Sequence, residues 1–178
     1  ADMFRVNEMT DGASVTVGDL IVTARANAHF ASETGEGVEG VSLSYRFEID
    51  GRSITYTGDT GPSDAVTDLA AGSDLLVSEV MDFEALIAAM RQNTPHMPAE
   101  VFDQMAMHIR THHLTGEQVG AAAGEAAVEQ VLLTHYAVPP GPLENSADAI
   151  LDGVRQHYSG PVHFGRDLAS FDVGCNDR

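Results

Sequence analysis

The periodicity of apolar residues changes near residue 60, and this change limits the folds open to the chain. Before it, short stretches of alternating apolar and polar residues predict strands, and Asp50-Gly51 between two of them is a strong signal for a two-residue hairpin. After it, apolar runs of strand length alternate with stretches of helical spacing. A β-rich half followed by alternating strands and helices is typical of a layered α/β domain with a mixed sheet.

The expected strands and helices follow from these patterns and from the turn residues between them. Strands are predicted at Ser14–Val17, Leu20–Ala26, Ser42–Ile49, Ser53–Tyr56, Asp74–Val80, Val131–Thr134, Val162–Phe164 and Leu168–Val173. Helices are predicted at Pro62–Ala71, Phe83–Gln92, Pro98–Thr111 and Ser146–Tyr158. One more helix begins at Thr115, where Gln118 completes a capping box. The Gly/Glu-rich stretch Ser32–Gly40 is predicted to be a loop.

The charge of the chain is strongly one-sided. Its 178 residues include 27 Asp and Glu against nine basic residues, a formal net charge of −18, and all nine basic residues are Arg. The absence of Lys excludes Schiff-base lysines and a P-loop, and an acidic surface repels nucleic-acid phosphates. No apolar run approaches the roughly 20 residues that cross a bilayer. We therefore expect neither nucleic acid nor membrane as a partner, and the sequence leaves a bacterial cytoplasm and a periplasm equally open.

Polar side chains follow the C-terminal ends of several predicted strands. Asp59 comes after Ser53–Tyr56, Glu79 and His135 end two buried strands, and His29 lies shortly after Leu20–Ala26. Loops at that end of an open α/β sheet converge, and a set of His and Asp is what zinc binds. Each residue also has a simpler interpretation: a turn for Asp59, core packing for the two histidines, and helix capping for Glu79.

Two other histidines have helical spacing. His108 and His112 lie four residues apart on the predicted helix Pro98–Thr111 and its end, so they could share a metal. An exposed helix face is the simpler interpretation of this pair.

Four sequence blocks resemble the C-terminal half of a metallo-β-lactamase-fold hydrolase, in the branch that contains ribonuclease Z and its small-molecule-hydrolysing relatives. The blocks are Val22–His29 with Ser44–Glu48, Ile54–Pro62, His113–Gly120 and Val131–His135, and Val162–Leu168 resembles the closing strand of that branch. The resemblance implies an αββα sandwich, of which this chain is the C-terminal part with a mixed sheet flanked by helices.

The resemblance also implies site residues and an activity. His29, Asp59 and His135 correspond to metal ligands, with Asp59 bridging two divalent ions, and His113 corresponds to a catalytic residue that is not a ligand. Zinc is the expected metal, with manganese and iron as alternatives. The implied reaction is attack by a metal-held hydroxide on an ester, phosphodiester, sulfate ester or lactone of a small molecule, with Glu79 orienting a ligand.

The sequence departs from the family in two places. The signature His-x-His-x-Asp-His, which supplies four ligands, is absent from residues 1–178. We therefore expect the chain to be the C-terminal portion of one domain, inactive alone, and completed by an N-terminal half in the same or a separate polypeptide. Only 30 residues separate His29 from Asp59, too few for a tRNA-binding arm.

Other interpretations stay open at this point. A non-catalytic module that keeps the fold would also lack the signature motif, and metal content distinguishes it from the enzyme. The Met-rich segment Met81–Arg110 is predicted to cap the pocket or simply to pack as helices, and a homodimer is possible. The acidic, Lys-free composition is also typical of adaptation to high salt or of a base-composition bias, neither of which bears on activity.

Overall fold

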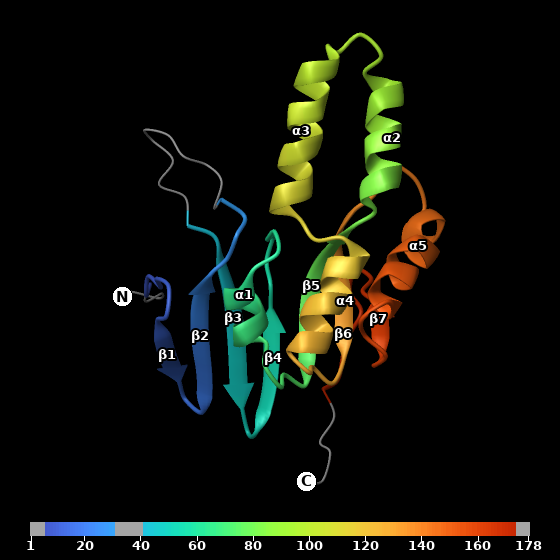
Figure 1. Ribbon diagram of the computed structural model, residues 1–178. Helices are drawn as coiled ribbons and strands as arrows, with labels where there is room; N and C mark the ends of the chain where they lie inside the picture. Colours follow the sequence, from blue (N-terminus) through green and yellow to red (C-terminus); the bar gives the residue numbers. More distant parts are fainter. Residues whose placement is uncertain (1–5, 31–40, 174–178) are drawn as a thin grey trace.

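Seven strands lie side by side in the order in which they occur along the chain (Figure 1). The computed structural model describes residues 6–30 and 41–173, so the loop predicted at Ser32–Gly40 lies outside the described residues. The strands are β1 Ser14–Val17, β2 Leu20–Ala26, β3 Leu43–Ile49, β4 Arg52–Tyr56, β5 Leu75–Met81, β6 Val131–Ala137 and β7 Val162–Phe164. The helices are α1 Asp64–Leu69, α2 Phe83–Asn93, α3 Ala99–His112, α4 Gly116–Glu125 and α5 Glu144–Arg155.

The sheet is mixed, as the sequence predicted. Strands β1 to β4 form an antiparallel meander, and β4 to β7 are parallel. Asp50 and Gly51 join β3 to β4 with φ of 51° and 73°, the positive pair that a type I′ hairpin turn requires. Because β2, β4, β5 and β6 run in the same direction, their C-terminal ends meet at one edge of the sheet.

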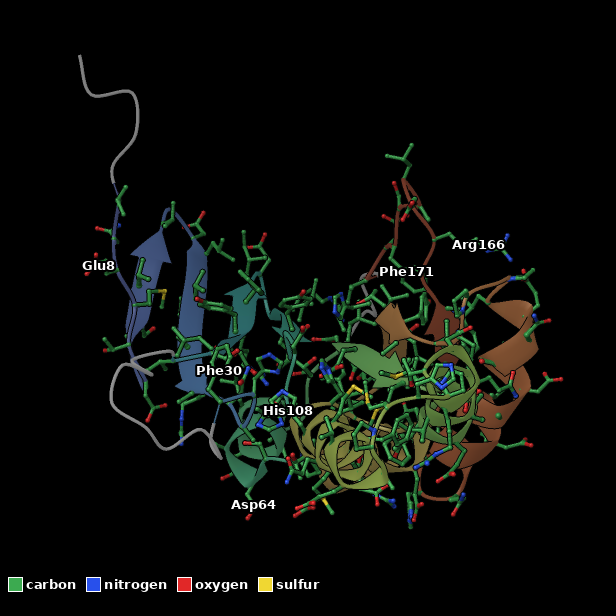
Figure 2. All side chains as sticks on the ribbon, turned by 90° about the horizontal axis from the view of Figure 1, so that it is seen from above. Glu8, Phe30, Asp64, His108, Arg166 and Phe171 are labelled. Carbon is green, nitrogen blue, oxygen red and sulfur yellow. The ribbon has the colours of Figure 1, made fainter. Side chains whose placement is uncertain are left out.

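One face of the sheet packs against α1, α4 and α5. Leu76 of β5 and Val131 of β6 are directly opposite each other and belong to the core cluster, together with α4 and α5 residues such as Val119 and Val154. Burial of these apolar side chains is the main stabilising contribution of this layer. Seen from above, Asp64 at the start of α1 marks the helical side of the sheet (Figure 2).

The opposite face carries a row of apolar and aromatic side chains across adjacent strands. Paired residues of a sheet share a face, and pairing links Ala24, Tyr45, Tyr56, Val77 and Leu132 in turn. In this row Tyr56 is 41% exposed, Ala24 is buried, and the other three residues are half-buried. In the described part of the chain no helix covers this face, and the segment around Phe171 rises on it at one end (Figure 2). We call this row the open face of the sheet.

Helices α2 and α3 form a hairpin that projects beyond the C-terminal edge of the sheet (Figure 1). Arg91 of α2 lies 3.9 Å over the ring of Phe102 in α3 and pairs with Asp103 at 3.1 Å. Within the described residues, α2 has no buried residue and α3 has two, Phe102 and His112. The hairpin is therefore held to the body mainly at its base. No helix in these residues is long and apolar enough to span a membrane.

Two sequence predictions about strands were wrong. Leu168–Val173 forms no strand, because the chain turns at Arg166–Ala169 with Leu168 at a φ of 63°. Strand β6 does not stop at Thr134 but continues to Ala137, past His135. The other elements form with ends shifted by up to three residues, and Thr115 and Gln118 make the predicted capping box.

Candidate metal centre

The predicted site residues converge at the edge where β2, β4, β5 and β6 end. One ligand atom from each of His29, Asp59 and His113 lies within 4.8 Å of the others, the one group of three or more potential metal ligands found in the described residues. His135 joins this group through Asp59, since its Nε2 lies 3.3 Å from Asp59 Oδ2. The side chains of Asp59 and His135 are 35% and 60% exposed, so both remain accessible from outside.

A β-bulge places His135 at this edge. Thr134 pairs with Glu79 and Tyr136 pairs with Val80, so His135 between them has no partner in β5. Its φ of 44° lies in the left-handed region, which costs a non-glycine residue about 1–2 kcal/mol. Bulges redirect side chains near active sites. The sequence placed His135 after the end of its strand, whereas the bulge turns it out of a strand that continues.

Glu79, which the resemblance implied would orient a metal ligand, holds His113 through a hydrogen bond. Glu79 is 2% exposed, and its Oε2 lies 2.7 Å from Nδ1 of His113. Its Oε1 accepts a hydrogen bond of 2.6 Å from the backbone N–H of Thr60. Glu79 therefore joins His113 to the loop that carries Asp59.

Burial and pairing shift the acidities of these two groups. Burial raises the pKa of Glu79, which outweighs the hydrogen bonds from His113 and Thr60. The hydrogen bond to Glu79 raises the pKa of His113, which keeps its imidazole charged to a higher pH than usual. With Nδ1 engaged by Glu79, Nε2 is the nitrogen of His113 available to other groups.

The loop that carries His29 is fixed by three further contacts that the sequence analysis missed. The Nδ1–H of His29 donates to the backbone oxygen of His112 at 3.1 Å, which leaves Nε2 available to a metal. The backbone N–H of Ala28 donates to Thr60 Oγ1 at 3.1 Å, and Asn27 accepts from the backbone N–H of His29 at 3.1 Å. The neighbouring Gly-Asp-Thr sequence marks the loop of Asp59 but gives no sign of these partners.

Of the pair His108 and His112, only His108 is exposed, as the simpler interpretation of the sequence expected. Their ring centroids are 4.0 Å apart, but His112 is only 2% exposed. Its Nδ1 contacts the backbone oxygen of His108, so this ring nitrogen is engaged within α3. His112 is thus a buried residue at the base of the α2–α3 hairpin.

The donors at the edge fit a divalent transition metal. Imidazole nitrogens and a carboxylate oxygen suit zinc, and they also suit manganese or iron. The hydrogen bonds to Nδ1 of His29 and of His113 are the orienting contacts that metal-binding histidines ordinarily have.

Comparisons with known proteins agree with this fold. Residues 2–136 match the family described as the beta-lactamase superfamily domain, as the four sequence blocks predicted. An uncharacterized protein of Mycobacterium leprae is 29% identical over 178 residues, which are 100% of this chain and 51% of that protein. Ribonuclease Z of Mycobacterium tuberculosis is 28% identical over 132 residues, 74% of this chain and 43% of that enzyme.

A solved structure shows the same fold. The metallo-β-lactamase-fold protein YhfI from Bacillus subtilis aligns with a TM-score of 0.60 and 18% identity, over 89% of this chain and 52% of YhfI. The chain thus spans about half the length of the relatives it matches.

Proposed function

The chain belongs to the beta-lactamase superfamily, and from this premise we propose that it forms part of the active site of a metal-dependent hydrolase. The proposed substrate is a small-molecule ester, phosphodiester, sulfate ester or lactone. The observation that carries the proposal is the convergence of His29, Asp59, His113 and His135 at one edge of the sheet. These four residues come from distant parts of the sequence, and their polar side chains meet at this edge.

His29, Asp59 and His135 would hold the metal, zinc in the first place. We propose two metal ions in the complete enzyme, which Asp59 would help to hold and for which the N-terminal half would supply the remaining ligands. Bound zinc acts as a Lewis acid and lowers the pKa of water towards about 7. The exposure of His135 and Asp59 leaves room for groups from outside this chain.

His113 is the proposed proton donor to the leaving group. Its Nδ1–H is held by the buried carboxylate of Glu79, which stabilises the charged imidazolium. The proton on Nε2 is then the one that can move to a leaving-group oxygen. General acid catalysis of this kind typically contributes about 10²–10⁴-fold.

The open face of the sheet supports the proposal of a second half. An apolar face of this extent is costly in water, and an edge strand with unpaired backbone groups invites further pairing. The relatives are about twice as long as this chain, so they contain a segment of suitable size. We propose that this segment, in the same or a separate polypeptide, covers the open face.

A nucleic acid is not the proposed substrate, although a relative of this chain is a ribonuclease Z. The net charge of −18 works against binding of a phosphate backbone. A small phosphodiester is the substrate class to test first, because it keeps the chemistry of that relative without its polyanionic ligand.

Native mass spectrometry of the purified protein tests the proposal, followed by hydrolysis of bis(p-nitrophenyl) phosphate. We expect a longer or companion polypeptide with about two zinc ions per unit, and turnover that EDTA removes and zinc restores. A precursor tRNA serves as the contrasting substrate and should not be cleaved. A protein that contains both halves of the fold, yet binds no zinc or stays inactive after zinc loading, would overturn the proposal.

A further inference from the structure

The two loops that carry His29 and Asp59 both rest on the last turn of α3. The loop of His29 contacts it through the hydrogen bond from His29 Nδ1 to the backbone oxygen of His112. The loop of Asp59 contacts it through Gly61, where an added Cβ would overlap the backbone oxygen of Thr111. The same Cβ would lie 3.7 Å from the Cβ of Ala28, so Gly61 sits where both loops and the helix meet.

Only a glycine allows this approach. A backbone oxygen at the end of a helix cannot swing aside as a flexible side chain can, so any side chain at residue 61 forces the helix end and the loop apart. The φ of Gly61 does not lie in the left-handed region that favours glycine. The requirement for glycine here is therefore close packing and not backbone conformation.

We infer that Gly61 is a positioning residue, which seats the end of α3 between the two ligand loops and thereby orients His29 and His113 together. His113 is the C-cap residue of α3, so its place follows directly from where the helix ends. His29 depends on the same turn through the oxygen of His112. A displacement of this helix end moves one candidate ligand and the residue that Glu79 holds, at the same time.

The effect of Gly61 on metal affinity rests on the proposed function. The contacts of Gly61 and of His29 with the end of α3 do not depend on it. The backbone oxygen of His112 accepts a proton-bearing nitrogen, so it selects the Nδ1–H tautomer of His29. Loss of an orienting partner behind a metal-binding histidine typically costs about 10–100-fold in metal affinity. Gly61→Ala is expected to cause a loss of this size.

A matched control comes from the contact between α4 and α5. An added Cβ at Gly120 would overlap the backbone oxygen of Val154, a clash like that at Gly61 but within the helical layer. Gly120→Ala should therefore lower the thermal stability without changing zinc affinity. Zinc titration of the purified protein and its two variants compares the three dissociation constants.

The tautomer of His29 gives a test that needs no variant and no metal. In metal-free protein at pH 8, ¹⁵N NMR should show His29 with its proton on Nδ1, and Gly61→Ala should increase the Nε2–H form. An Nε2–H tautomer in the unaltered protein, or a loss of zinc affinity no larger in Gly61→Ala than in Gly120→Ala, would overturn the inference. Failure of the proposed hydrolysis with the expected tautomer and affinity change would overturn the proposed function alone. If Gly61→Ala does not fold, the tautomer of His29 in the unaltered protein decides whether the backbone oxygen of His112 orients this ring.

Discussion

The carboxylate of Glu79 lies 2.7 Å from Nδ1 of His113, although 34 residues separate the two in the sequence. Glu79 is buried near the end of β5, and His113 follows the end of α3. A charge-assisted hydrogen bond in such a place is stronger than one in water and fixes the direction of the ring. The pair therefore sets both the position and the protonation of His113.

Removing the imidazole of His113 should abolish proton donation without removing the metal. We expect His113→Ala to lower the turnover of bis(p-nitrophenyl) phosphate by about 10²–10⁴-fold. The metal content, measured by elemental analysis, should stay that of the unaltered protein, because the proposed ligands are His29, Asp59 and His135.

His96→Ala is the control for this experiment. His96 is exposed in the turn between α2 and α3, away from the edge of the sheet, so both turnover and metal content should be unchanged. A loss of metal in His113→Ala would show that His113 is itself a ligand, as its place within 4.8 Å of His29 and Asp59 would then allow.

The pH profile should depend on Glu79. The hydrogen bond to Glu79 raises the pKa of His113, so the protonated donor persists to higher pH and turnover should fall as the pH rises through that pKa. Glu79→Gln keeps the size of the side chain but removes its charge, which lowers the pKa of His113. The alkaline limb of the turnover profile should therefore move to lower pH.

Glu84→Gln provides the matched change, since Glu84 is an exposed residue in the first turn of α2. Its profile should overlay that of the unaltered protein. An alkaline limb that stays in place in Glu79→Gln would mean that His113 is not the group whose protonation controls turnover.

The sequence predicted the sheet and the candidate residues that meet at its edge, but not the contacts that support these residues. Hairpin residues and apolar runs act locally, so Asp50-Gly51 and the buried strands were found from neighbouring residues alone. The partner of Glu79 could not be found in this way, because it comes from the end of a helix distant in sequence. The bulge at His135 and the close packing at Gly61 could not be predicted either. Each depends on contact with the backbone of another element, β5 for His135 and α3 for Gly61.

Asp59 should be required for the metal if it is a ligand. Asp59→Ala is expected to reduce both the metal content and turnover to background, because it removes the carboxylate that lies between His29 and His135. Asp68→Ala, at an exposed position in α1, should change neither. A variant at Asp59 that keeps metal and activity would leave this residue as an ordinary turn residue of the Gly-Asp-Thr loop.

The stability of the sheet should depend on a second buried carboxylate, Asp74, at the other end of β5 from the site. Asp74 accepts hydrogen bonds from the backbone N–H of Ser53 at 2.8 Å and from Arg52 at 2.9 Å. Burial alone would raise the pKa of Asp74, but the Ser53 amide and the Arg52 guanidinium outweigh it and hold this pKa below its ordinary value. The charged form is thus favoured by folding.

A pKa that is lower in the folded protein than in the unfolded chain fixes the direction in which stability changes with pH. The stabilisation is fully present above the ordinary carboxyl pKa of about 3.9 and is lost as the pH falls through the lower pKa of folded Asp74. Asp74→Asn should lower the free energy of unfolding at pH 7 by about 1–3 kcal/mol, because it leaves the guanidinium of Arg52 without this anionic partner. Urea unfolding at pH 7 and pH 3 measures the free energy of unfolding of the variant and of the parent. The difference between these two free energies should be smaller at pH 3 than at pH 7. Asp19→Asn, in the exposed β1–β2 turn, is the control. Its free energy of unfolding should stay within about 0.5 kcal/mol of the parent value at both pH values. An equal loss at both pH values would assign the effect to packing and not to the charge of Asp74.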